Sequence, residues 1–401
     1  MNFIKIIPKK LLGLIILSAL GVLVSFILNL YIDGNFEEEV YRNYIKFQSS
    51  ANIIFMLLNF GFFNSIALYY NKSNNFNVLF SIIQKHFFRI ILLTVTLIIF
   101  FLLFNSDYLA VSMVFFLTYL IREVLNTLTK TTGHLSFSLV AKLIIPLFVI
   151  LLVFFLTSIN DFNEIHIIII YTIVSIFFMV LTFLIYSRKI NFKFDHKEVL
   201  IFEKQYFSYA AFTGLSYILS GTWPDLVYLF YDSNVTTNEA AILKTSLLIF
   251  SPLLILNQSL GIFLFSQFKK YIKNSSKFFV NYIFFVLMNI IIGILYYFIF
   301  YDIFSNFFTF SNELILLKWI GIIMVFSQII YIPVDVLMST IKKGHVLFIS
   351  TSIMFLFSTG TSFFLKINPM YIYFFSFLMG NFSYLISQII FYQKYKTLVF
   401  N

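Results

Sequence analysis

Long runs of apolar residues, separated by short polar segments, recur along the whole chain. Most runs have about 18 to 25 residues, enough for a helix to cross a hydrocarbon core about 30 Å thick. The pattern predicts an all-α polytopic membrane protein. The expected transmembrane helices number about twelve: 11–32, 44–70, 87–104, 108–129, 137–158, 165–187, 207–231, 240–265, 278–300, 314–338, 346–365 and 370–393.

The first apolar run follows Lys5, Lys9 and Lys10, as in a secretory signal. It continues to Leu30 without a small-residue cleavage site, which predicts an uncleaved first helix. Composition agrees with a membrane protein, because 60% of residues are hydrophobic and only 11% are charged, against about 25% in soluble domains. Cysteine is absent, which excludes disulfides and thiol chemistry.

Loop charges predict the orientation. If the N-terminus is cytoplasmic, most of the 27 Lys and Arg residues fall in inner segments and most acidic residues in outer ones. Both termini are then cytoplasmic, and we expect a multi-pass protein of the bacterial inner membrane. The net charge of +10 is thereby explained as a topology signal, without a nucleic-acid partner.

Short matches between the two halves of the chain indicate an internal repeat. Gly-His-x-x-Phe occurs at 133–137 and again at 344–348, six expected helices later. Lys46 and Asn59 stand thirteen residues apart, and a second Lys and Asn, at 244 and 257, repeat this spacing. An offset of six helices gives both halves the same orientation, as in parallel-repeat transporters.

We therefore expect a six-helix bundle at 1–187, a cytoplasmic linker at 188–206 and a second six-helix bundle at 207–401. The linker is basic with apolar insertions. It suits either a helix on the inner-leaflet surface or a solvated connector.

Three segments resemble bacterial polysaccharide flippases. Residues 44–70, with Asn59-Phe60-Gly61, are similar to their second helix; 207–230, with Trp223-Pro224-Asp225, to their seventh; and Asn238-Glu239-Ala240-Ala241 to the motif before their eighth. A glycine that commonly precedes the second helix is replaced by Glu39-Val40. The resemblance implies the MATE-like fold of the multidrug/oligosaccharidyl-lipid/polysaccharide exporter superfamily.

Two cations at membrane depth are the leading substrate-binding candidates. Ionisable groups there cost roughly 2.5–3.5 kcal/mol each and need a partner or a cavity. Arg122 lies deep in the fourth expected helix and Lys142 near the start of the fifth. Together they suit a diphosphate, which arginine binds with two hydrogen bonds and lysine as a point charge. The alternative is that Arg122 pairs with Glu123 or Asp335.

Three carboxylates are candidates for ion coupling or gating: Glu123, Asp225 and Asp335. The last two lie close to a proline, which bends a helix and frees backbone carbonyls. Such a carboxylate suits H⁺ or Na⁺; alternatively it pairs with Lys244 or Lys318, or is protonated.

Lys46 and Lys244 begin corresponding helices, where they either contact substrate or anchor the helix at the surface. No Gly-rich loop followed by Lys and Ser or Thr occurs, so we expect no nucleotide. Cysteine is absent and the five histidines are scattered, so we expect no metal and no other cofactor. Energy would come from an ion gradient, the membrane potential or mass action.

These features favour a flippase, not an enzyme, that moves a polyprenyl-diphosphate-linked oligosaccharide to the outer leaflet by alternating access, beside polysaccharide-assembly enzymes. O-antigen or a related surface polysaccharide would be the product. The alternatives are an ion-coupled multidrug antiporter, a peptidoglycan-precursor flippase and a polysaccharide polymerase. The short, acidic outer segments argue against the polymerase, which would need a large outer loop with basic residues.

Overall fold

The structure is a computed structural model, and every element among its described residues is a helix. It describes residues 9–60, 76–132, 134–157, 162–187, 344–364 and 369–400, with isolated residues and short stretches within 62–66, 197–229 and 287–294. The chain divides into two compact units. One comprises Ile16–Leu226, and the other comprises Met1–Ile15 with Val227–Asn401.

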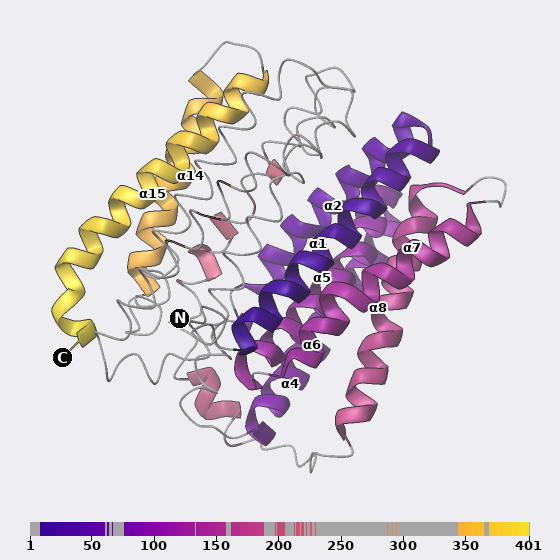
Figure 1. The fold of residues 1–401 in the computed structure, drawn as a ribbon, viewed down its shortest axis with the longest axis horizontal. Coiled ribbons are helices and arrows are strands. Elements are labelled where there is room, and N and C mark those ends of the chain that lie inside the picture. Colours follow the sequence, from indigo (N-terminus) through magenta and orange to yellow (C-terminus); the bar gives the residue numbers. More distant parts are fainter. Residues whose placement is uncertain are drawn as a thin grey trace. The chain divides into compact units, whose positions relative to one another are not determined.

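Most helices of the first unit follow the predicted apolar runs closely, but the helix that ends at Leu103 begins at Phe76, eleven residues before the predicted run 87–104. The helices are α1 (Lys9–Asn35), α2 (Glu38–Asn59), α4 (Phe76–Leu103), α5 (Asp107–Thr132), α6 (Leu135–Leu139), the π-helix η2 (Val140–Ile144), α7 (Ile145–Leu156) and α8 (Glu164–Ser187). Elements α6, η2 and α7 form one continuous helix (Figure 1). In the described part, four spans are long and apolar enough to cross a membrane: Asn77–Leu103, Asp107–Thr132, Leu135–Leu156 and Glu164–Ile185.

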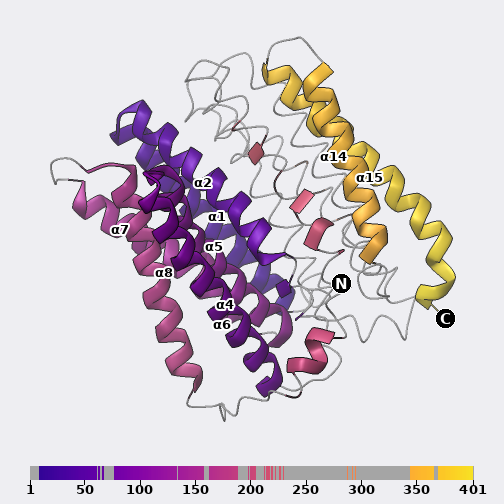
Figure 2. The same cartoon turned by 180° about the vertical axis from the view of Figure 1, so that it is seen from behind.

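Helix α5 is the central helix of this unit. It packs against α2, α4 and α8, and both views show α2, α5 and α8 side by side (Figures 1 and 2). In its most apolar stretch 56% of the residues are buried, against 11% for α4. Because α4 leaves so much apolar surface uncovered, it is the helix of this group that faces lipid most.

Among the described residues other than glycine, two with positive φ end helices. Asn105 (φ 54°) follows α4; Ser106 N–H donates to the Phe101 carbonyl at 2.8 Å and Asn105 N–H to that of Leu102 at 3.2 Å. This is a Schellman cap, and Asn tolerates the left-handed conformation better than most residues. The three-residue break predicted between 87–104 and 108–129 is therefore a true helix end.

The second break corrects a predicted span. The apolar run 44–70 is expected to form one helix, but α2 ends at Asn59 and Phe60 adopts φ 46°. Phe60 N–H donates to the Met56 carbonyl at 3.3 Å, and the Phe60 backbone lies directly against Gly214. Apolarity continues through the break, so hydropathy alone does not reveal it.

The described part of the second unit contains α14 (Gly344–Phe364) and α15 (Pro369–Phe400), which pack against each other along their length (Figure 2). Gly380 of α15 lies so close to the Ser358 hydroxyl of α14 that a β-carbon there would collide with it. Small residues allow such close approach between membrane helices. Helix α14 matches the predicted span 346–365, and α15 covers the span 370–393 and continues seven residues beyond it.

Candidate functional site

Polar side chains form a stripe along α5. Tyr119, Arg122 and Asn126 recur at spacings of three and four residues, which places them on one face of the helix. All three are half-buried, in a helix that is otherwise mostly buried apolar surface. A polar face directed into a protein interior has to be matched by polar partners, because unpaired polar groups are costly there.

A matching stripe runs along α2. Tyr44, Gln48 and Asn52 follow one another at intervals of four residues, and Asn59 lies two turns further on. The Tyr119 hydroxyl of α5 donates to the Gln48 carbonyl at 3.4 Å. The two stripes therefore meet at the contact between α2 and α5. This polar face accounts for the lower hydropathy of α2, which is not among the four most apolar spans.

Aromatic rings pack around the junction. Phe115 contacts Tyr44, Tyr119 and Tyr171 of α8, with ring centroids 5.8, 5.8 and 5.9 Å away. Phe55 stacks on Tyr119 at 6.2 Å. The three tyrosines thus place their hydroxyl-bearing rings about one buried phenylalanine. Aromatic faces with polar ends suit ligands that have both apolar and hydroxyl surfaces.

Arg122 lies beside this aromatic group. It is fifteen residues into α5, roughly 22 Å along the axis at 1.5 Å per residue. Its guanidinium is close enough to Tyr119, Tyr171 and Lys142 for its charge to act on each of them. In the described part of the chain no carboxylate forms an ion pair with Arg122.

Glu123 does not pair with Arg122. Its Oε1 lies 3.0 Å from Lys130 Nζ, two turns along the same helix, and both side chains are mostly buried. Residues seven apart share a helix face, whereas neighbours point about 100° apart. One of the two proposed partners of Arg122 is therefore already neutralised; the other, Asp335, lies outside the described residues.

Lys142 occupies the π-helical turn η2. The wide turn precedes Pro146, which has no backbone N–H to bond the carbonyl four residues back, at Lys142. Gly21 of α1 lies directly against the Lys142 carbonyl, where a β-carbon would collide with it. π-Helical turns occur frequently at functional sites. The close approach of α1 fixes the backbone from which the Lys142 side chain extends.

Asp225 is brought to the α2 stripe from far along the chain. The Asn52 side-chain amide donates to Asp225 Oδ2 at 2.6 Å, across 173 residues of sequence. The carboxylate is also close enough to act electrostatically on Tyr119. The structure thus groups Arg122, Lys142 and Asp225 around α5, as far as the described residues extend.

The remaining predicted site residues are not part of this group as described. Lys46 lies on another face of α2 from Tyr44 and Gln48, and its carbonyl accepts from the Tyr108 hydroxyl at 3.2 Å. Lys244 lies outside the described residues, as does Asp335. Among the residues described, no three His, Cys, Asp or Glu side chains gather as metal ligands.

Sequence reasoning missed the α2 half of the site. Tyr44, Gln48 and Asn52 carry no charge, and only their four-residue spacing within an apolar run marks them. The Tyr44 hydroxyl is fully buried beside Gln48 without a hydrogen bond of good geometry in the described structure, and the Asn126 side-chain oxygen is likewise buried without one. Buried polar atoms are nearly always satisfied, so the Asn126 oxygen is a site for bound water, whereas the Tyr44 hydroxyl has the Gln48 side chain beside it.

Known proteins share the fold of this chain. No family model and no curated protein sequence matches it. Among solved structures, a multidrug resistance MATE family transporter of the MOP superfamily, in an outward-facing conformation, matches with a TM-score of 0.71 at 15% identity, over 98% of this chain and 96% of that one. The MATE multidrug transporter DinF-BH, solved as a complex, matches with a TM-score of 0.72 at 13% identity, over 98% and 97%.

These likenesses establish the fold: the chain is a multi-pass, helical membrane protein with the architecture of MATE transporters. The predicted fold class is confirmed. The count of twelve helices, the boundaries of the two bundles and the cytoplasmic termini remain predictions.

Proposed function

We propose that this protein is a flippase that carries a polyprenyl-diphosphate-linked oligosaccharide across the cytoplasmic membrane by alternating access of its two halves. The observation that supports this proposal most directly is the position of Arg122. It lies deep along α5, no carboxylate forms an ion pair with it in the described structure, and its charge acts on Lys142. Two neighbouring cations at membrane depth suit a ligand with two or more negative charges.

The surrounding side chains suit the sugar part of such a ligand. Sugars present hydroxyl groups on their edges and C–H groups on their faces. The half-buried Tyr119 ring provides a surface for a C–H face, and the half-buried Gln48, Asn52 and Asn126 provide amides for the hydroxyl groups. The buried Tyr44 and Tyr171 pack on Phe115 and hold this group in place. Arg122 at the inner side of this group would bind the diphosphate, while the polyprenyl tail stays in lipid.

An ion-coupled antiporter for cationic drugs is the second candidate. Asp225 favours it, because a carboxylate at membrane depth, held by Asn52 and near Tyr119, can bind a proton or a cation. The MATE structures with the same fold include multidrug transporters. In the flippase, Asp225 would take the coupling ion instead of the substrate.

Deleting the gene and extracting the lipid-linked oligosaccharides separates the two functions. Loss of a flippase leaves complete oligosaccharide units on the polyprenyl carrier and removes the polymer from the cell surface. Loss of an antiporter leaves the lipid pool unchanged and increases sensitivity to cationic drugs. If single capped units still reach the surface after the deletion, the protein acts in polymerisation and the flippase proposal fails.

A further inference from the structure

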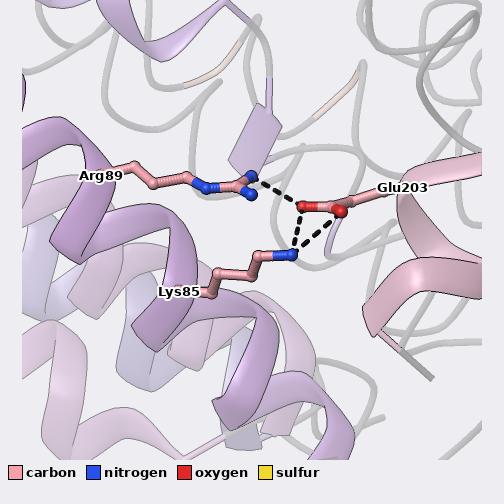
Figure 3. Close-up of polar contacts among 3 residues, drawn as sticks. All are labelled: Lys85, Arg89 and Glu203. Atoms are coloured by element: carbon pink, nitrogen blue, oxygen red, sulfur yellow. Dashed lines mark hydrogen bonds and ion pairs between the residues drawn. The ribbon is translucent and has the colours of Figure 1, made fainter. Parts of the chain in front are cut away.

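The linker between the predicted bundles is attached to the inner end of α4. Described residues 197 and 199–204, here called the linker segment, are helical. Glu203 accepts hydrogen bonds from Lys85 Nζ at 3.0 Å and from Arg89 Nη1 at 2.7 Å (Figure 3). Because the two cations stand one turn apart on α4, both reach the same carboxylate.

Apolar contacts reinforce this attachment. Val199 and Phe202 are each 1% exposed, and the Phe202 ring meets that of Phe62 edge to face at 5.5 Å. Phe62 in turn stacks on His86 of α4, with ring centroids 3.4 Å apart. One face of the linker segment is therefore buried against the first unit, which fixes which residues face outward.

The outward face is apolar at its centre and basic at its ends. Leu200 is 60% and Ile201 43% exposed, and the exposed residues Lys197 and Lys204 flank them. A water-facing helix of this length would be expected to carry polar residues at those two central positions. An apolar strip flanked by lysines is instead typical of a helix that lies in a membrane interface.

The height of the attachment along α4 agrees with a membrane interface. A hydrocarbon core about 30 Å thick takes about 20 helical residues. Counted inward from Leu103 at the outer end of α4, this length ends near position 84. Lys85 and Arg89 therefore stand close to the inner edge of the core, and Phe88 between them is still 62% exposed.

The charge of the linker favours anionic lipid. Between 188 and 206 the chain has five cations, Arg188, Lys189, Lys193, Lys197 and Lys204, and three anions, Asp195, Glu198 and Glu203. The charge of Glu203 is neutralised by Lys85 and Arg89 of α4, so it does not offset the positive charge of the linker's own lysines. Basic residues next to an interfacial helix attract anionic headgroups of the inner leaflet.

We propose that the linker segment lies in the inner-leaflet interface, with Leu200 and Ile201 inserted among the lipids and Lys197 and Lys204 bound to anionic phospholipid headgroups. This site is separate from the polar stripes of α2 and α5 and does not depend on the transported substrate. It would hold the connection between the two bundles at the membrane surface.

Spin labelling of the full-length protein in nanodiscs tests the proposal. The natural chain has no cysteine, so Leu200→Cys provides a single labelling site, and Glu39→Cys at the exposed outer end of α2 is the matched aqueous control. The Leu200 label should collide more with oxygen, which concentrates in lipid, than with a water-soluble nickel chelate. The Glu39 label should show the reverse.

Lipid composition tests the second part. Adding phosphatidylglycerol to phosphatidylcholine nanodiscs should move the Leu200 label deeper, and Lys197→Gln with Lys204→Gln should abolish that shift. A label more accessible to nickel would show a solvated connector, and a label accessible to neither reagent would show a segment covered by protein; both results overturn the proposal. If phosphatidylglycerol leaves the depth of the Leu200 label unchanged, the proposal that the linker segment binds anionic lipid is wrong.

Discussion

Glu123 and Lys130 form an ion pair two turns apart on α5, with Glu123 Oε1 3.0 Å from Lys130 Nζ. The pair lies on a different face of the helix from Arg122, although Glu123 is its neighbour in sequence. This arrangement keeps Arg122 apart from the carboxylate beside it. The carboxylate next to Arg122 in the sequence is instead paired with Lys130, in the last turn of α5.

The first prediction concerns Arg122 itself. Arg122→Ala should abolish transport of the lipid-linked oligosaccharide while protein level and thermal stability are retained, because the residue sits in a polar stripe and carries no ion pair in the described structure. Arg122→Lys should restore transport only partly, since a lysine cannot bind a diphosphate with two parallel hydrogen bonds. Surface polysaccharide and the accumulated lipid-linked pool are the measurements. Full activity of Arg122→Ala would remove this residue from the mechanism.

The second prediction separates structural from functional charges on the same helix. Lys130→Ala should lower the free energy of unfolding by about 1–3 kcal/mol, because it leaves the Glu123 carboxylate mostly buried without its partner. Glu123→Gln should cost less, because Lys130 is near the helix end and can extend towards water. Thermal unfolding in detergent measures both. If Lys130→Ala and Glu123→Gln lower the melting temperature equally, the buried Glu123 carboxylate does not depend on Lys130 for its stability.

The third prediction uses two glycines of α1. Gly21→Ala places a β-carbon against the Lys142 carbonyl and should destabilise the protein by about 1–3 kcal/mol, as overpacking commonly does. Gly34→Ala is the matched control, because no atom lies within 4 Å of the β-carbon position there. It should be neutral or slightly stabilising, since alanine favours helix. If both variants melt at the same temperature, α1 does not approach η2 as described.

The fourth prediction concerns Asp225. Asp225→Asn keeps a side chain of the same shape beside Asn52 but removes the charge, so the protein should fold while transport loses its dependence on an ion gradient. Transport into proteoliposomes with and without a proton or sodium gradient measures this. Unchanged gradient dependence would assign Asp225 a structural role only.

The fifth prediction is a pH dependence of the linker attachment. Partial burial acts to raise the pKa of Glu203, but the hydrogen bond from Lys85 and the charge of Arg89 outweigh it and hold the pKa below its ordinary value. Attachment is therefore fully stabilised above the ordinary glutamate pKa of about 4.3 and weakens as pH falls through the lower folded value. Hydrogen exchange of residues 199–204, corrected for intrinsic rates, should rise in that range. Glu203→Gln should raise exchange already at neutral pH and remove the pH dependence.

Charge marked part of the candidate site in the sequence, and the roles of those residues remain predictions. An arginine or lysine inside a long apolar run stands out because its burial is costly, and this singled out Arg122 and Lys142. Gln48 and Asn52 were not singled out, because a neutral amide is inexpensive enough to occur in many membrane helices. The break at Phe60 was also missed, since it comes from a backbone conformation that leaves no trace in hydropathy.

The sequence alone determined that this protein is a helical, multi-pass membrane protein and where most of its described helices lie, although it missed the end of α2 at Asn59 and the start of α4 at Phe76 by eleven residues each. The reason is physical: in lipid every backbone group must be bonded within its own segment, so length and apolarity are sufficient to define a helix. Only the tertiary structure decided which charges are paired. The ion pairs Glu123–Lys130 and Glu203 with Lys85 and Arg89 depend on how each helix is rotated about its axis. The hydrogen bond from Asn52 to Asp225 depends on a contact across 173 residues of chain. Local sequence encodes neither helix rotation nor such long-range contacts.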